Sequence, residues 1–512
     1  MSFLKQHIHW RSIFSQVGLL LHVPSAMATF SLGICAIFHE WFALLPLTVT
    51  ALLGFGVGQL LYRSCKKKEP YHLWDAMIIA ALGWIVCSIL AAIPIAWIAS
   101  SLLDSGVQSD VLATFAQPIN SVFEAFSGLT STGLTMMRNQ GFFPYTLQWW
   151  RSLLEWIGGI GLITFILSLI HLNQDYQLYY AEARTEHLTK NMMKTTQWIW
   201  GIYVVYSLLG TALFFLAGMP LWEAINHAMT VIATGGFTVI RTQFRDYNTA
   251  IQFIAILIML IGAISFSIHC YAICNHNWSV IWKNMQLRLL YCLALLGGGL
   301  LIVVDISNQS ANHWFDAFFE WVSALTTCGF NTVSLNTFSP MAKLLLIIGM
   351  TIGGATGSTA GGIKIRRIMY LFSAIFLRLA TITKTNEKVI TKDVPNEGSP
   401  DEEEPPGTAL PYGEKSERLF TAEVLFSLWM TTLAFGWLVV LKWTPKGAAL
   451  DGLFDVASAI SNVGLTSGIL NPDLPTTGKC LFMFLMWVGR LEIIPALVLL
   501  ITLPLSITKR RN

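Results

Sequence analysis

The sequence predicts an all-α polytopic membrane protein in which four pseudo-symmetric helix–pore loop–helix repeats surround one pore, preceded by an extra N-terminal helix pair. Three observations carry this prediction: an apolar composition, ten apolar segments of spanning length, and a motif that recurs four times. Residues of the set AVILMFWYC make up 54% of the 512 residues and charged residues only 12%, and the mean hydropathy is +0.58. An ordinary soluble domain is about 25% charged, so the composition excludes soluble folds, coiled coil, disorder and nucleic-acid binding.

The apolar segments set the number and direction of the spans. A spanning helix needs about 20 mostly apolar residues. Such segments lie at 15–38, 41–62, 75–100, 149–171, 198–218, 249–274, 287–305, 341–380, 419–441 and 478–507. An even number places both termini on one side of the membrane. With the termini inside, the inner segments hold 23 Lys and Arg residues and the outer ones 8, and because cytoplasmic loops carry this excess, both termini are predicted to be cytoplasmic.

The spans divide the chain into six parts. These parts are an N-terminal transmembrane helix pair at 1–70, repeat 1 at 71–180, repeat 2 at 181–280, repeat 3 with a broken second helix at 281–383, an acidic loop at 384–418, and repeat 4 at 419–512. Segment 384–418 is acidic and proline-rich and cannot bury enough apolar surface to fold. We therefore expect a disordered cytoplasmic loop, and the sequence leaves its role open.

The recurring motif ends in a glycine on the outer side of each repeat. The aligned glycines are Gly133, Gly236, Gly329 and Gly464. Thirteen residues earlier stand Asn120, Glu223, Asp316 and Asp451, and nine residues earlier stand Glu124, His227, Glu320 and Asp455. These offsets lie on one face of a helix, and acidic or amide side chains suit a helix's first turn. Each motif therefore predicts a short helix that starts near the outer surface.

An extended stretch follows each short helix, and the four stretches are the candidate ion-binding filter. Its residues are Thr130, Ser131, Thr132, Gly133, Ala233, Thr234, Gly235, Gly236, Thr326, Thr327, Cys328, Gly329, Ser461, Asn462, Val463 and Gly464. Non-helical backbone at membrane depth is tolerated only where protein or water lines it, and a ring of carbonyls can replace the hydration shell of a potassium ion. Glycine suits such a ring because it accepts positive φ. The alternative is that these glycines only end outer helices or form tight turns.

The eighth span carries a glycine-rich segment, 351–362, that is a candidate gate. The residues assigned to it are Gly353, Gly354, Gly357, Gly361, Gly362 and Lys364. The alternative is close packing of one continuous helix through small residues. Glycine costs a helix interior about 1 kcal/mol relative to alanine, and broken spans in transporters mark the ion path. We therefore predict an intramembrane loop below the filter.

Arg490 is a charge within the last apolar segment. Such a charge costs at least about 2.5 kcal/mol and should face protein or water. The functional interpretation is a pore barrier beneath the filter, and the alternative is an ion pair with Glu492. His269 fits a buried, hydrogen-bonded side chain and a pore-side contact equally, and Glu155 is left undecided.

Four motifs resemble the Trk/Ktr/HKT superfamily of potassium transporters. They are Phe126-Ser-Gly-Leu-Thr-Ser-Thr-Gly133, Arg151-Ser-Leu-Leu-Glu-Trp-Ile-Gly-Gly-Ile-Gly161, Gly353-Gly-Ala-Thr-Gly-Ser-Thr-Ala-Gly-Gly362 with Lys364, and Gly489-Arg-Leu-Glu492. With the extra helix pair at 15–62, the chain is most similar to the bacterial Trk membrane subunit, TrkH. Two features depart from that pattern. The insert 384–418 is long, and Glu155 stands where glutamine is expected.

The resemblance implies a homodimer in the bacterial inner (plasma) membrane, with one pore per protomer and a cytoplasmic, nucleotide-binding regulatory subunit of the TrkA type. It implies the loop as gate, Arg490 as barrier, and, through Gly133, selectivity for potassium over sodium. Potassium would be the substrate, with no cofactor in this chain.

Two other classes of protein make predictions that differ from potassium uptake through a pore. A secondary transporter that couples potassium entry to sodium or proton flux, as a symporter, predicts two inverted halves rather than four units. A membrane-embedded enzyme needs clustered Asp and His residues or a His-Glu-x-x-His motif, and the sequence contains neither. The sequence therefore predicts potassium uptake and no enzyme activity.

Overall fold

The computed structural model describes residues 8–65, 72–137, 143–169, 177–178, 181, 192–239, 244–304, 313–383 and 412–509. Within these ranges the secondary structure is helical, without strands. Of the predicted acidic loop, 384–411 lies outside the described residues, and 412–418 already belongs to a helix, α19.

The helices follow the predicted order of a hairpin and four repeats. The hairpin comprises α1 (Trp10–Leu20), α2 (His22–Ile37), η2 (Trp41–Ala43) and α3 (Leu44–Ser64). Repeat 1 comprises α4 (Leu73–Asp104), α5 (Asp110–Phe115), α6 (Pro118–Leu129), α7 (Tyr145–Ile160) and α8 (Leu162–Leu169). Repeat 2 comprises α10 (Met192–Leu216), α11 (Leu221–Ile232), η3 (Phe244–Asp246), α12 (Thr249–Gly262), α13 (Phe266–Cys274) and α14 (Ser279–Lys283). Repeat 3 comprises α15 (Met285–Val304), α16 (His313–Leu325), η4 (Leu335–Thr337), α17 (Pro340–Ile352) and α18 (Ile365–Thr383). Repeat 4 comprises α19 (Tyr412–Val440), α20 (Ala449–Ile460), α21 (Thr476–Arg490) and α22 (Ile494–Lys509).

The polytopic membrane architecture agrees with the sequence, but the second helix of every repeat is broken. In the described part of the chain, six helices can cross a membrane, or up to nine if each bent pair counts as one span. The bends are 79° between α7 and α8, 91° between α12 and α13, and 117° between α21 and α22, and α17 and α18 are separated by residues 353–364. The sequence predicted only the break at 353–364. The other three were missed because hydropathy gives the length of an apolar segment and not a change in its direction.

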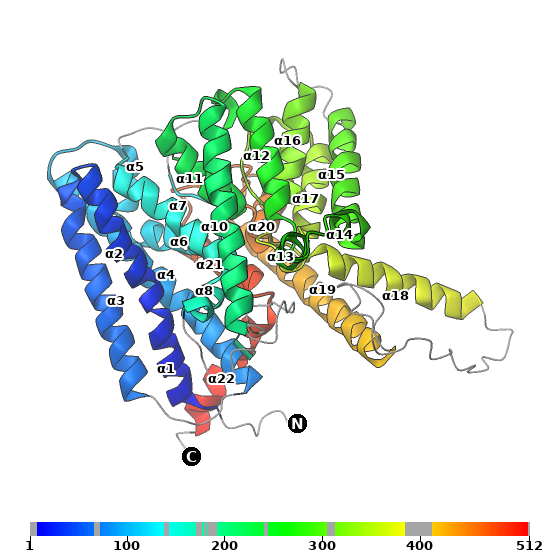
Figure 1. Ribbon diagram of the computed structural model, residues 1–512, viewed down its shortest axis with the longest axis horizontal. Coiled ribbons are helices and arrows are strands. Elements are labelled where there is room, and N and C mark those ends of the chain that lie inside the picture. The colour runs from blue at the N-terminus through cyan, green and yellow to red at the C-terminus, as the bar shows by residue number, and fades with distance from the viewer. Residues whose placement is uncertain are drawn as a thin grey trace.

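The N-terminal hairpin lies along one side of the bundle (Figure 1). It packs tightly because Gly18 and Gly58 bring α1 and α3 together; a Cβ on Gly58 would lie 2.6 Å from the Gly18 carbonyl. At its tip, the buried Glu40 carboxylate accepts the backbone N–H groups of Tyr145 and Thr146 at 2.8 and 2.7 Å. These groups open α7, so the hairpin caps a helix of repeat 1.

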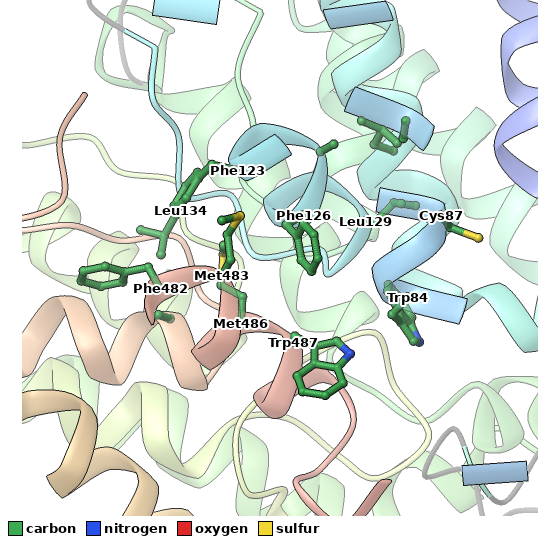
Figure 2. Close-up of a cluster of buried hydrophobic side chains, with 14 of the residues drawn as sticks. Trp84, Cys87, Phe123, Phe126, Leu129, Leu134, Phe482, Met483, Met486 and Trp487 are labelled. Carbon is green, nitrogen blue, oxygen red and sulfur yellow. The ribbon is translucent and has the colours of Figure 1, made fainter. Parts of the chain in front are cut away.

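Contacts between repeats form a closed ring. Each second helix packs on the short helix of the next repeat: α7 on α11, α12 on α16, α17 on α20, and α21 on α6. Figure 2 shows the joint between repeats 4 and 1, where Met486 and Trp487 of α21 meet Phe126 of α6 and Trp84 of α4. The Trp487 indole N–H donates to the Ala81 carbonyl at 3.1 Å. The four repeats therefore surround a single axis.

Candidate functional site

Each short helix ends in the same turn. The residue two before the aligned glycine is left-handed, with φ of 53° at Ser131, 50° at Thr234, 55° at Thr327 and 53° at Asn462. The next N–H bonds a carbonyl five residues back: Thr132 to Ser127, Gly235 to Thr230, Cys328 to Ser323 and Val463 to Ser458, at 2.8–2.9 Å. This is the Schellman arrangement, which satisfies the free carbonyls of a helix end. The turn stops the short helices at one level and redirects the backbone.

The four aligned glycines form a ring of backbone. Their φ values are 82° at Gly133, 88° at Gly236, 85° at Gly329 and 100° at Gly464. A Cβ added to each would overlap a carbonyl of the next repeat, and the pairs are Gly133 with Gly235, Gly236 with Cys328, Gly329 with Val463, and Gly464 with Thr132. The pairs run through all four repeats and return to the first. Both the left-handed backbone and this close approach require glycine.

Carboxylates fasten the backbone beyond three of these glycines. Glu124 accepts the Met136 N–H at 3.0 Å, Glu320 the Thr332 N–H at 2.6 Å, and Asp455 the Ser467 N–H at 2.6 Å. All three side chains are fully buried. From the sequence, the residues nine before each glycine were assigned to one face of the short helix. Their role as hydrogen-bond acceptors for the backbone after the glycine is seen only in the structure.

The glycine-rich segment is a loop directly against the inner ends of the short helices. α17 ends at Ile352 and α18 begins at Ile365. The alternative interpretation, one continuous helix packed through small residues, is therefore wrong. The Gly362 N–H donates to the Ser461 carbonyl at 3.1 Å, and the Gly361 N–H donates to the Thr327 hydroxyl at 2.6 Å. The loop therefore touches candidate filter residues of repeats 3 and 4.

Repeat 2 also holds this loop. The Thr359 hydroxyl lies 3.0 Å from the carbonyls of both Ile232 and Gly262. The Ala355 N–H donates to the Ala263 carbonyl at 2.9 Å. Hydrogen bonds at the α11 end and at the α12–α13 break thus fix the loop across the axis.

Arg490 lies at the last turn of α21, at the 117° bend, and not within a continuous span. Its guanidinium donates to the carbonyls of Gly158, Gly159 (2.8 Å) and Thr359 (3.4 Å). It therefore bridges the C-terminal end of α7 and the loop, where backbone carbonyls offer a favourable site for a cation. Arg490 and Lys364 both line an open cavity, together with Asn462 and with the loop residues Gly357, Ser358, Ala360, Gly361 and Gly362.

Glu492, the alternative partner of Arg490, forms an ion pair with another residue. Glu492 pairs with Arg367 of α18, while the Lys364 ammonium donates to the Ala360 carbonyl. The basic groups at the inner end of the loop thus have separate structural partners.

The undecided residues now have positions. His269 is buried, with Nδ1 2.9 Å from the Tyr206 hydroxyl and Nε2 3.2 Å from the Ile261 carbonyl, which favours the buried, hydrogen-bonded interpretation. Glu155 is fully buried behind the repeat-2 stretch and accepts the Phe237 N–H. No sequence signal placed it there, because α7 belongs to repeat 1.

Fold and site together define a polytopic membrane protein with four pore repeats around one axis. Comparison with known proteins then gives the family. The family model for TrkH, described as cation transport protein, matches residues 48–297 and 299–507, and the chain belongs to this family.

Individual relatives agree over nearly the whole chain. An uncharacterized cation transporter of Methanocaldococcus jannaschii is 30% identical over 458 residues, covering 88% of this chain and 87% of that protein. The Trk system potassium uptake protein TrkH of Halomonas elongata is 27% identical over 511 residues, covering 96% and 98%. The crystal structure of the potassium transporter TrkH from Vibrio parahaemolyticus superposes with a TM-score of 0.79 at 24% identity, covering 96% and 98%.

Proposed function

We propose that this protein carries potassium ions into the cell through the axis between its four repeats. The single observation behind the proposal is the closed ring of glycines, in which each filter glycine lies against a carbonyl of the next repeat. Such a ring holds backbone oxygens around one axis without side chains between them. Carbonyl oxygens arranged in this way substitute for the water shell of a potassium ion.

The short helices add to the attraction for a cation. α6, α11, α16 and α20 all end at this ring, and the C-terminal end of a helix carries a partial negative charge. Four such ends favour a cation at the inner side of the filter. The name of the Halomonas elongata relative, a potassium uptake protein, agrees with this ion.

Residues 353–364 act as the gate in this proposal, and Arg490 acts as the barrier. The loop is bonded to the ends of α11, α16 and α20, so an ion leaving the filter meets backbone rather than water. Conduction requires these bonds to break. Arg490 places a positive charge beside the same loop, which raises the energy of a cation passing it.

The proposed setting is the bacterial inner membrane, with both termini in the cytoplasm. We propose a homodimer with one pore per protomer, regulated by a cytoplasmic nucleotide-binding subunit of the TrkA type. Coupling of potassium entry to sodium or protons is the alternative mechanism. It predicts that uptake follows the gradient of the second ion.

The direct test is rubidium or potassium uptake in potassium-starved cells that lack their own uptake systems. We expect uptake from the full chain, and no uptake with or without a regulatory subunit refutes the proposal. Repeating the measurement while sodium is replaced and the proton gradient is collapsed separates a channel from a coupled transporter. Uptake driven by membrane potential alone favours the channel.

A further inference from the structure

Repeat 2 lacks the carboxylate that fastens the other three filter segments. The residue nine before its glycine is His227, whose Nδ1 lies 2.8 Å from the Glu223 carbonyl in the preceding turn of its own helix. Glu124, Glu320 and Asp455, at the same position of the other repeats, each accept N–H groups beyond the glycine. The repeat-2 segment must therefore be held in another way.

Glu155 supplies that acceptor from another repeat. Both of its carboxylate oxygens accept the N–H of Phe237, at 3.1 and 3.0 Å, and Phe237 directly follows the filter residue Gly236. Glu155 belongs to α7 of repeat 1, which packs on α11 of repeat 2. The contact thus crosses the boundary between repeats.

The filter segment of repeat 2 has a matching space. A Cβ on Gly235 would lie 2.5 Å from the Glu155 carboxyl carbon and 2.5 Å from its Oε2. The equivalent residues of the other repeats, Thr132, Cys328 and Val463, all carry side chains. Repeat 2 therefore differs from the other repeats in two related ways. It has glycine at position 235, and the space left by the missing side chain is filled by the Glu155 carboxylate.

Among the second helices of repeats 1, 2 and 4, a carboxylate occurs at this position in repeat 1 alone. They align on glycines that pack against the end of their own short helix, namely Gly158, Gly262 and Gly489. Three residues earlier stand Glu155, Met259 and Met486. All three side chains are buried. Methionine fills such a site without polar groups, whereas a buried carboxylate needs hydrogen bonds to offset its burial.

Arg151 also holds the extended segment that follows Gly236. Its guanidinium donates to the Thr238 carbonyl at 2.9 Å and to Glu124 at 2.7 Å, and it lies over the Phe237 ring at 4.0 Å. Residues one helical turn apart on α7 thus hold two successive residues beyond Gly236. These contacts fix the position of the repeat-2 filter carbonyls along the axis of the four-glycine ring.

We propose that Glu155 is a specificity-determining residue, which positions the repeat-2 filter backbone through the Phe237 N–H and so maintains discrimination between potassium and sodium. The inference rests on the proposed function. Glu155 acts through the backbone and does not contact the ion. What matters is an acceptor oxygen at this depth, and the negative charge is secondary.

Two substitutions separate position from charge. Glu155→Gln keeps an oxygen at the same distance and removes the charge, whereas Glu155→Asp keeps the charge and withdraws it by one methylene. We measure the ratio of rubidium to sodium uptake, which is independent of the amount of protein in the membrane. Glu155→Gln should stay within about twofold of wild type, and Glu155→Asp should fall about fivefold, the equivalent of one hydrogen bond of about 1 kcal/mol.

Ser152→Ala is the matched control, because Ser152 is equally buried on α7 but, among the described residues, its hydroxyl donates to the Gln148 carbonyl of its own helix alone. Its ratio should equal that of wild type. A normal ratio in Glu155→Asp, or loss of selectivity in Glu155→Gln alone, overturns the inference while leaving potassium uptake intact. Absence of wild-type uptake instead refutes the proposed function.

Purified protein gives a second readout if Glu155→Asp does not reach the membrane. Potassium should raise the melting temperature of wild type and Glu155→Gln above the value in sodium. Glu155→Asp should lose that difference. A difference equal to wild type in Glu155→Asp contradicts the inference.

Discussion

Thr359→Val should open the pore by releasing the gating loop. The Thr359 hydroxyl is 1% exposed and lies 3.0 Å from the carbonyls of Ile232 and Gly262. Valine has nearly the same shape but cannot donate a hydrogen bond, so the Ile232 carbonyl loses this donor in the closed arrangement. In the open arrangement, water can bond the freed groups, and the substitution therefore destabilises the closed loop selectively.

The size of the effect follows from one hydrogen bond. A net contribution of about 1 kcal/mol changes the opening equilibrium about fivefold, because 1.4 kcal/mol corresponds to a factor of ten. Rubidium uptake into proteoliposomes should rise by the same factor while the loop is mostly closed. Thr359→Ser, which keeps the hydroxyl, should remain at the wild-type rate.

The opposite result would refute this reasoning. If Thr359→Val takes up rubidium at or below the wild-type rate with normal incorporation, the loop bonds do not oppose conduction. If Thr359→Ser rises as much as Thr359→Val, packing rather than the hydroxyl is responsible. Measuring uptake per incorporated protein excludes differences in expression.

Three further predictions concern the barrier, the filter and the hairpin. Arg490→Ala should raise the rate of rubidium uptake, since it removes a positive charge beside the loop, and lower uptake at normal expression would contradict the barrier role. Gly133→Ser should lower the rubidium-to-sodium uptake ratio, because its Cβ overlaps the Gly235 carbonyl; an unchanged ratio would contradict the filter assignment. Glu40→Ala should lower stability by about 2 kcal/mol, the loss of charged hydrogen bonds to the first N–H groups of α7, measured as melting temperature in detergent. Ser31→Ala, which loses only a bond within α2, is its control, and an equal melting temperature for both variants would show that the cap contributes nothing.

The sequence predicted the fold well because its signals are local. Spans are read from apolar runs, and the four short helices from the register of Gly133, Gly236, Gly329 and Gly464. Their left-handed backbone follows from residue type. The break at 353–364 was predicted for the same reason, since glycine and hydroxyl residues concentrate there.

Other parts of the site depend on contacts that residue type does not encode. The bend after α7 falls at a glycine, Gly161, with φ of 105°, but at the bend after α21 two residues that are not glycine, Glu492 and Ile493, take positive φ. Glu155 could not be placed because its partner, Phe237, is 82 residues away in another repeat. Such pairings follow from how the repeats pack.

The position two before the aligned glycine is used differently in repeat 3, the repeat that carries the glycine-rich loop. Its side chain joins neighbouring repeats at two places, where Asn462 donates to the Thr132 hydroxyl at 2.9 Å and Ser131 donates to the Ala233 carbonyl at 2.8 Å. In repeat 3 the same position is Thr327, whose hydroxyl instead accepts the Gly361 N–H of the loop. The backbone ring is fourfold, but of these four side chains as the structure describes them, Thr327 is the one that hydrogen-bonds the loop. Loop movement must therefore break a bond to the filter itself, so that in the proposed mechanism the state of the gate and the geometry of the repeat-3 filter segment change together.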